Sequence, residues 1–148
     1  MKVVIQRSGH SKVLVNQEVV GEIRSGLVLL ICFEKKDLTK NKKELLEKAK
    51  QKILALRIFE DSEGKMNKSI VDFGGEVLAI SQFTLSWDGQ KGNRPSFDES
   101  MPPDSAKVYF DEFVQMIRES RIVQTGVFGA SMDVQIQNLG PVTFSLDF

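Results

Sequence analysis

The sequence contains one cysteine and one histidine, and this scarcity excludes several kinds of site. Cys32 alone cannot build a disulfide framework or a cysteine-based zinc finger, so a reducing, cytosolic compartment is expected. Because it lies inside an apolar run, Cys32 is expected to be buried and unreactive. With His10 as the one imidazole, an all-histidine metal site is excluded, and a serine–histidine–aspartate triad would have to use this residue. The glycines also lack the spacing of a phosphate-binding loop or a dinucleotide fingerprint.

Long hydrophobic runs are missing as well. The longest, Leu27–Phe33, is far too short to cross a bilayer. The first residues after Met1 turn polar too early for a signal peptide. The sequence therefore predicts a soluble, unprocessed, cytoplasmic protein that does not bind membranes.

The formal net charge is zero, which excludes a strongly basic, dedicated nucleic-acid binder. The charges are unevenly spread, because residues 1–60 carry a net charge of +6 and residues 61–148 a net charge of −6. Much of the positive excess lies in lysines between residues 35 and 52. Such a lysine face is either a solvated helix face or a surface that follows phosphates, and composition alone favours the solvated face.

The apolar pattern predicts an α+β fold in one domain, residues 1–148. Two main helices are expected, one capped by Asp37 and running to Leu56, the other capped by Asp104 or Ser105. Strands are expected over 2–6, 12–16, 18–23, 27–33, 76–83, 132–136 and 142–148. The continuous apolar run at 27–33 is typical of a strand buried on both faces. Because the many strands do not alternate strictly with the two helices along the chain, the order of elements indicates a mainly antiparallel sheet or partial barrel.

Three segments differ from their surroundings. Residues 86–104 form the longest expected loop, and long loops in compact domains tend to be functional or mobile. Ser81-Gln82-Phe83-Thr84-Leu85 ends a strand in hydrogen-bonding side chains, which either face a cleft or satisfy a turn. Gly140-Pro141 is expected to be a tight turn joining the last two strands.

Two of these segments together carry a family resemblance. Ser81-Gln82-Phe83-Thr84-Leu85 and Asn138-Leu139-Gly140-Pro141-Val142-Thr143 resemble the paired signature of the D-aminoacyl-tRNA deacylase family. Further stretches agree in order along the chain, namely 5–7, 64–67, 94–97 and 124–130. Two departures are the stretch 8–12, which leaves His10 without a family role, and Leu139, where relatives often have an acidic residue. Ser81 and Phe83 place the chain outside a related animal branch that has proline and alanine there.

The resemblance implies a homodimer that hydrolyses the ester between a D-amino acid and the 3′-terminal adenosine of tRNA. It also implies removal of glycine mischarged on alanine tRNA, with no metal and no other cofactor. The catalytic segment would be Ser81, Gln82, Phe83 and Thr84. An aminoacyl ester is already activated, so main-chain N–H donors suffice to stabilise the oxyanion. Thr84 is a candidate nucleophile by position, but without a nearby base a positioning role is favoured.

Chirality would follow from the second signature. The family's Gly–Pro bond is cis, and the resemblance implies that the carbonyls of Gly140 and Pro141 enter the partner subunit's pocket and leave no room for an L side chain. Phe128 and Met132 are candidates for the substrate pocket. The candidate tRNA contacts are Lys40, Lys43 and Lys50. No DNA partner is expected.

Two other functions stay open from the residues alone. One is a non-catalytic protein that binds the tRNA 3′ end through the lysine face and the same cleft. The other is a small-molecule esterase or amidase that uses Thr84 and needs no tRNA.

Overall fold

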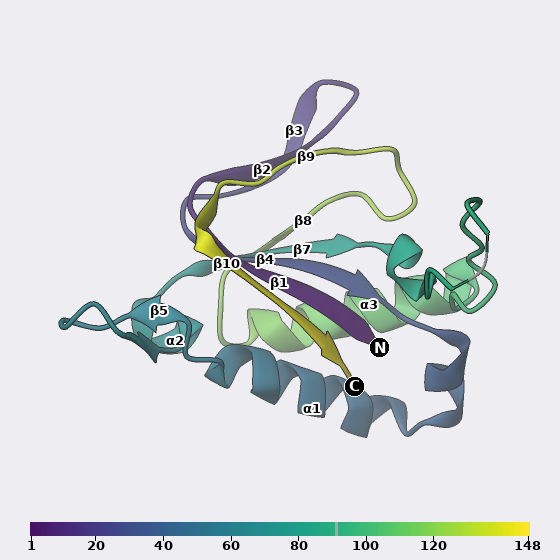
Figure 1. The fold of residues 1–148 in the computed structure, drawn as a ribbon, viewed down its shortest axis with the longest axis horizontal. Helices are drawn as coiled ribbons and strands as arrows, with labels where there is room; N and C mark the ends of the chain where they lie inside the picture. Colours follow the sequence, from purple (N-terminus) through teal and green to yellow (C-terminus); the bar gives the residue numbers. More distant parts are fainter. Residues whose placement is uncertain (91) are drawn as a thin grey trace.

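A five-stranded sheet forms the centre of the molecule, a computed structural model that describes residues 1–90 and 92–148 (Figure 1). Its strands, in spatial order, are β10 (Asn138–Asp147), β1 (Lys2–Ser8), β4 (Gly26–Cys32), β7 (Glu76–Ser81) and β8 (Val123–Thr125). β1 pairs antiparallel with both β10 and β4, whereas β4–β7 and β7–β8 are parallel. The sheet is therefore mixed, with the parallel pairs at one side.

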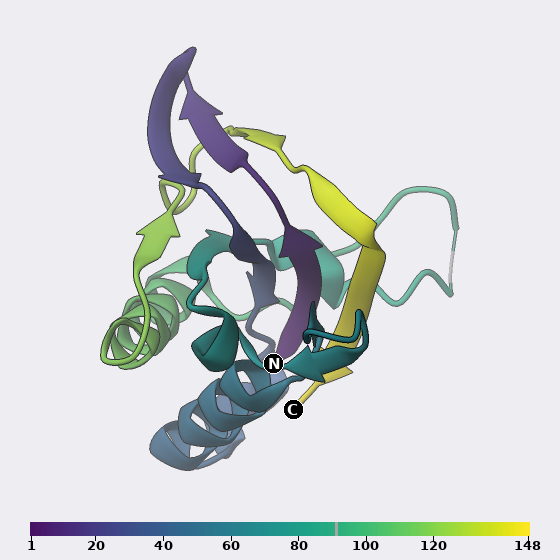
Figure 2. The same cartoon turned by 90° about the vertical axis from the view of Figure 1, so that its left-hand side faces the viewer.

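Two smaller sheets flank this one. β3 (Glu18–Ile23), β2 (Ser11–Val15) and β9 (Asp133–Gln135) pair antiparallel in the order β3-β2-β9. The turn between β2 and β3 consists of Asn16 and Gln17, both with positive φ, so the two strands expected at 12–16 and 18–23 form a hairpin. β5 (Phe59–Glu60) and β6 (Met66–Lys68) form a short ribbon, and Figure 2 shows it beside β10.

The two main helices, α1 (Lys42–Ala55) and α3 (Pro103–Arg118), lie on one face of the five-stranded sheet (Figure 1). A four-residue helix α2 (Ile70–Phe73) and the 3-10 turns η1 (Lys35–Thr39) and η2 (Phe83–Ser86) complete the helical segments. Leu46 of α1 and Phe113 of α3 are fully buried in the core under this face. The α+β class with two main helices is thus confirmed. Within the described residues, no helix has the length and apolarity to span a bilayer.

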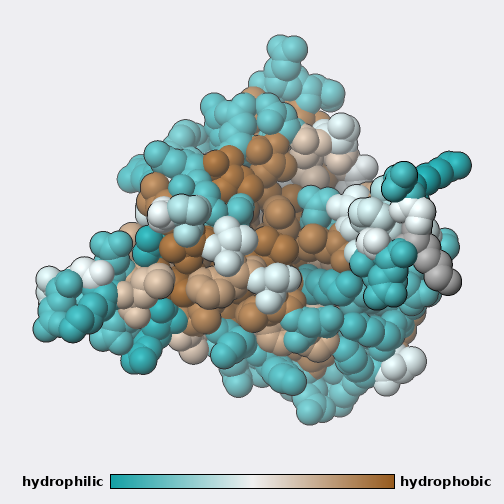
Figure 3. All heavy atoms as spheres, in the orientation of Figure 1, coloured by the Kyte–Doolittle hydropathy of each residue, from teal (hydrophilic) through white to brown (hydrophobic). Residues whose placement is uncertain are grey.

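β4 accounts for the continuous apolar run in the sequence. Leu27, Leu29 and Ile31 belong to the core on the helix side, while Val28 belongs to a second cluster under the β3-β2-β9 sheet. All four side chains are at most 2% exposed, as the predicted burial on both faces requires. Beyond these cores, Figure 3 shows apolar residues gathered in a hollow over the sheets, on the face turned towards the viewer.

Both predicted helix starts are wrong by a few residues. Asp37 lies in η1, where its carboxylate accepts hydrogen bonds from the Met1 ammonium and from the Glu34 amide. With that carboxylate engaged, α1 begins later and is capped by Asn41, whose side chain accepts from Glu44 N. α3 begins at Pro103 rather than after Asp104 or Ser105, since proline suits a first helical position.

The predicted tight turn at Gly140-Pro141 is also wrong. β9 and β10 belong to different sheets, and both residues lie inside β10. Along the β1–β10 pair, Ser8 lies opposite Asn138 and Gln6 opposite Thr143. Residues 139–142 therefore oppose a single residue of β1 and bulge out of the ladder. The alternating pattern of the flanking residues predicted strands on both sides of Gly140-Pro141. It did not predict that these two residues lie within a single strand, β10, which pairs with β1.

Candidate active site

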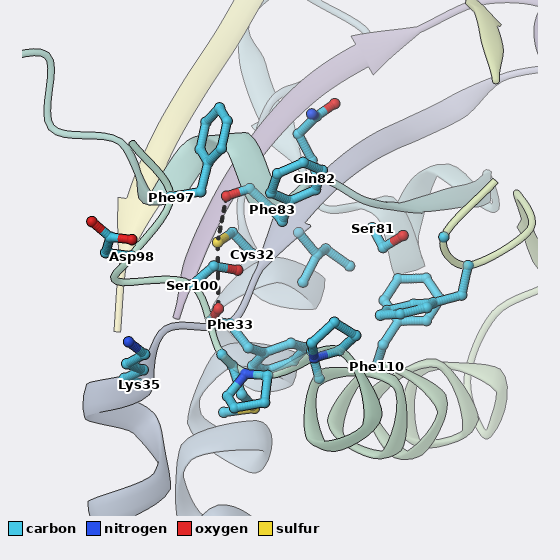
Figure 4. A pocket seen from close by; sticks show the side chains of 17 residues that line it. Cys32, Phe33, Lys35, Ser81, Gln82, Phe83, Phe97, Asp98, Ser100 and Phe110 are labelled. Carbon is cyan, nitrogen blue, oxygen red and sulfur yellow. Dashed lines mark hydrogen bonds between the residues drawn. The ribbon is translucent and has the colours of Figure 1, made fainter. Parts of the chain in front are cut away.

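A cavity of about 490 Å³ opens at the carboxyl ends of the parallel strands β4 and β7 (Figure 4). The carboxyl edge of parallel strands is a common place for ligands, because the chain leaves the sheet there in loops. Four segments wall the cavity: residues 31–35, residues 81–83, the loop and first turns of α3 between Phe97 and Phe110, and residues 128–129. The long loop expected at 86–104, which was predicted to be functional or mobile, thus supplies part of one wall.

The segment after β7 turns sharply at the cavity. Gln82 N donates to the Ile31 carbonyl at 2.7 Å, and the chain then enters η2. The Cys32 thiol donates to the Phe83 carbonyl at 3.5 Å, and Lys2 Nζ donates to the Leu85 carbonyl at 3.2 Å. Both donors belong to other segments of the chain, and they fix the positions of the Phe83 and Leu85 carbonyls in this turn.

The first amide groups of such a turn have no partner within it. In the part of the chain that the structure describes, the N–H groups of Phe83 and Thr84 have no hydrogen-bond acceptor. Two unpartnered donors on consecutive residues are suited to bind a developing oxyanion.

Three of the four predicted catalytic side chains line the cavity, namely Ser81, Gln82 and Phe83. Thr84 does not line it but lies exposed on η2, where its hydroxyl accepts a hydrogen bond from the side-chain amide of Gln82. An amide N–H cannot take up a proton, so this contact orients the hydroxyl without activating it. His10 is elsewhere and contacts Glu22 of β3.

The cavity walls are mainly aromatic and apolar. Phe83 meets Phe97 edge to face, with ring centroids 5.0 Å apart, and Phe110 lies 6.0 Å from Phe128. Burial raises the pKa of the Cys32 thiol to about 11, so it stays protonated and keeps its role as a donor. A flat, apolar ring fits such walls, with polar contacts at a few points.

The remaining predicted residues are scattered. Phe128 lines the cavity, but Met132 packs against the second apolar cluster instead. Gly140 and Pro141 do not line the cavity; they are exposed, and the peptide bond between them is cis. Arg7 lies beside them, and its Nε donates to the Leu139 carbonyl at 3.0 Å.

The three predicted tRNA-contacting lysines lie away from the cavity. Lys40 Nζ is 2.9 Å from the Asp37 carboxylate, and Lys50 Nζ is 2.8 Å from Glu119. Lys43 is exposed on α1. Two of the three ammonium groups are therefore already held by carboxylates.

Sequence reasoning missed Lys35, Phe97 and Phe110 as cavity residues. Phe110 is among the buried residues of α3 and contributes both to the core and to the cavity wall. Phe97 lies in the long loop at 86–104, whose length alone does not single out this residue. Lys35 lies at the start of the lysine-rich stretch, and no local pattern separates it from its neighbours.

Comparisons with known proteins agree with one another on the family. Residues 4–147 match the D-Tyr-tRNA(Tyr) deacylase family. The D-aminoacyl-tRNA deacylase of Clostridium perfringens is 51% identical over 148 residues, covering 99% of this chain and 97% of that protein. The one of Kosmotoga olearia is 48% identical over 147 residues, with the same two coverages.

Two solved structures are similar over nearly their whole length. One, described as a c-Myc DNA unwinding element binding protein, has a TM-score of 0.91 and 39% identity, with 100% of this chain and 99% of that chain covered. The other, described as a probable eukaryotic D-amino acid tRNA deacylase, has a TM-score of 0.85 and 20% identity, covering 99% and 98%. The second likeness shows the shared fold only.

These similarities define the class of protein as a hydrolase of the ester bond in aminoacyl-tRNA. The chain belongs to the D-aminoacyl-tRNA deacylase family.

Proposed function

We propose that the cavity takes the 3′-terminal adenosine of a D-aminoacyl-tRNA and that the Ser81–Thr84 segment holds its ester for hydrolysis. The observation that carries this proposal is the position of the family's signature segment, which forms one wall of the cavity and has two unpartnered amides at its turn. Glycine on alanine tRNA is a second substrate, because it presents no side chain to exclude.

The chemistry needs little from side chains. An aminoacyl ester has a good leaving group, and the neighbouring 2′-hydroxyl lies within reach of its carbonyl. The amides of Phe83 and Thr84 stabilise the oxyanion, and one such donor is typically worth ~2.7–4 kcal/mol. Gln82 keeps the Thr84 hydroxyl oriented toward substrate or water. Thr84 acts by positioning, since among the described residues its side-chain hydrogen bond comes from the Gln82 amide, which is not a base.

Selection for D-amino acids comes from a second copy of the chain. Gly140 and Pro141 bulge from an exposed strand and are aimed away from their own core. Leu139 and Phe144 on the same strand are 39% and 37% exposed, and Phe83 at the cavity is 56% exposed. Covering such apolar groups favours association. In a two-fold dimer, the bulge of each protomer meets the cavity of the other and excludes an L side chain.

The direct test is deacylation by the purified protein of three substrates: D-tyrosyl-tRNA, L-tyrosyl-tRNA, and alanine tRNA mischarged with glycine. Hydrolysis of the first and third with sparing of the second is expected. Binding of charged tRNA without hydrolysis would support the non-catalytic alternative instead. Equal hydrolysis of a free D-tyrosine ester would support the small-molecule esterase.

Thr84→Val separates the two roles of the hydroxyl. A positioning hydrogen bond of ~1 kcal/mol predicts about a fivefold loss of rate, whereas loss of a nucleophile abolishes turnover. Thr84→Ser, which keeps the hydroxyl, is the matched control. Because one relative is described as binding a DNA element, the same protein is also titrated with single-stranded DNA. Tight DNA binding without deacylation would overturn the proposed function.

A further inference from the structure

Lys35 is the one lysine that lines the cavity in the described part of the chain. Figure 4 shows its side chain at the edge of the lining residues, on the same side as Asp98 and opposite Ser81, and this edge is called the cavity mouth below. Within the described residues, no carboxylate lies within 4.0 Å of its ammonium group. The lysines beside it differ, since Lys36 pairs with Glu34 at 3.0 Å and Lys2 pairs with the same residue at 3.3 Å.

The backbone under Lys35 is fixed to the opposite wall of the cavity. Lys35 N donates to the Glu99 carbonyl at 2.9 Å, and Met101 N donates to the Phe33 carbonyl at 3.0 Å. The Asp37 carboxylate accepts from Glu34 N at 2.8 Å and ties η1 to the buried amino group of Met1. The backbone that carries the Lys35 side chain is therefore held by hydrogen bonds on both sides. Within the described residues, its ammonium group has no carboxylate partner at the cavity mouth.

We propose that Lys35 binds the phosphodiester that links the 3′-terminal adenosine of the substrate to the preceding nucleotide. This inference rests on the proposed function. The terminal adenosine has its ester at the 3′ side of the ribose and this phosphate at the 5′ side. With the ester at Ser81 and the base between the aromatic walls, the phosphate leaves the cavity at the mouth, where Lys35 lies (Figure 4).

One carboxylate lies on the same side of the cavity as Lys35. Asp98 also lines the cavity, and its carboxylate accepts from the Ser96 hydroxyl at 2.6 Å. Like charges repel, so the phosphate must lie on the Lys35 side, while Asp98 remains available to ribose or base donors. Lys35 is thus a positioning residue that places the ester by holding the phosphate.

The test compares three substrates that differ in phosphate. These are a D-aminoacyl-tRNA, the same 3′ ester on the dinucleotide CpA, and the same ester on adenosine, which has no phosphate. For Lys35→Ala we expect kcat/KM to fall about fivefold on the first two, through KM, as an exposed ion pair allows. The adenosine ester should be hydrolysed at the wild-type rate.

Two variants control for charge and structure. Lys35→Arg keeps the cation and should restore most of the loss. Lys68→Ala removes the same charge from β6, which does not line the cavity, and should change nothing. The slope of log(1/KM) against log salt for tRNA should become shallower by about 0.7 in Lys35→Ala alone, as for one single-strand phosphate.

Several results would overturn the role of Lys35. An equal loss on all three substrates would mean a structural defect, and an equal loss in Lys68→Ala would mean a long-range field. Wild-type kinetics of Lys35→Ala on all three would also refute it. If the wild-type protein hydrolyses none of the three, the proposed function itself fails.

Discussion

Replacing Asp37 by asparagine removes the charge from the most buried ion pair of the protein. Asp37 and the Met1 amino group are both 0% exposed, and their charged atoms are 2.7 Å apart. The same carboxylate accepts from Glu34 N at 2.8 Å and from Lys40 Nζ at 2.9 Å. Asparagine has nearly the same shape, so the substitution tests charge rather than packing.

The expected loss is large because one charge stays behind. Removing one partner of a buried pair typically costs ~3–5 kcal/mol, since the remaining charge is left in a poorly solvated site. For a chain of this size, that loss corresponds to a fall in Tm of about 6–20 °C. Urea titration and calorimetry of Asp37→Asn beside the wild type measure both quantities.

The matched control is Asp147→Asn. Asp147 pairs with Lys36 at 3.2 Å, but the two side chains are 54% and 49% exposed. Water screens such a pair, and its loss should cost less than about 1 kcal/mol. If the two variants lose the same stability, or if Asp37→Asn loses under about 1 kcal/mol, the argument from burial is wrong.

The dependence of the free energy of unfolding on pH, below about pH 4, gives an independent check on the role of Asp37. Burial alone would raise the pKa of Asp37, but hydrogen bonds from the Met1 ammonium, the Glu34 amide and Lys40 lower it below its ordinary value of 3.8. The carboxylate is thus more stabilised in the folded than in the unfolded chain. Its contribution is present above pH 3.8 and is lost as the pH falls through the lower, folded value. Asp37→Asn should therefore flatten the stability curve in this acid window.

Three further predictions concern the proposed site and its surroundings. Gly140→Ala should abolish D-aminoacyl-tRNA hydrolysis while the fold persists, because φ is +131° and a Cβ would lie 2.6 Å from Val142 Cγ2; deacylation assays and circular dichroism measure this, and full activity would exclude a role for the bulge. Cys32 in the native protein should react with iodoacetamide far more slowly than in the unfolded chain, because a thiol with a pKa of about 11 is only about a thousandth thiolate at pH 8; mass spectrometry after timed alkylation measures this, and equal rates would refute it. The triple substitution of Lys40, Lys43 and Lys50 by alanine should weaken tRNA binding in a salt-dependent way, which filter binding measures. An unchanged affinity would mean that these lysines form a solvated or ion-paired face.

The sequence by itself determined the elements whose pattern is local. The apolar run at Leu27–Phe33 predicted a strand buried on both faces. The helical spacing of the apolar residues between 38 and 56 predicted the buried face of α1 at Leu45, Leu46, Ala49 and Ile53, but it also included Leu38, which is 46% exposed, and Leu56, which is partly buried. Periodicity works here because each side chain's environment follows from the repeat of its own strand or helix. The two signature segments likewise predicted the family, and the first of them supplies Ser81, Gln82 and Phe83 to the cavity wall, although not Thr84.

Only the tertiary structure decided which distant groups meet. Asp37 looks like a helix cap in the sequence, but the buried amino group of Met1 engages it and moves the start of α1. Gly140 and Pro141 look like a turn, but pairing of β10 with β1 places them in a bulge. Lys35 looks like its neighbouring lysines in the sequence, but the backbone hydrogen bond from its amide to the Glu99 carbonyl places it at the cavity mouth. Each outcome depends on contacts between residues far apart in the chain, and no local pattern encodes such contacts.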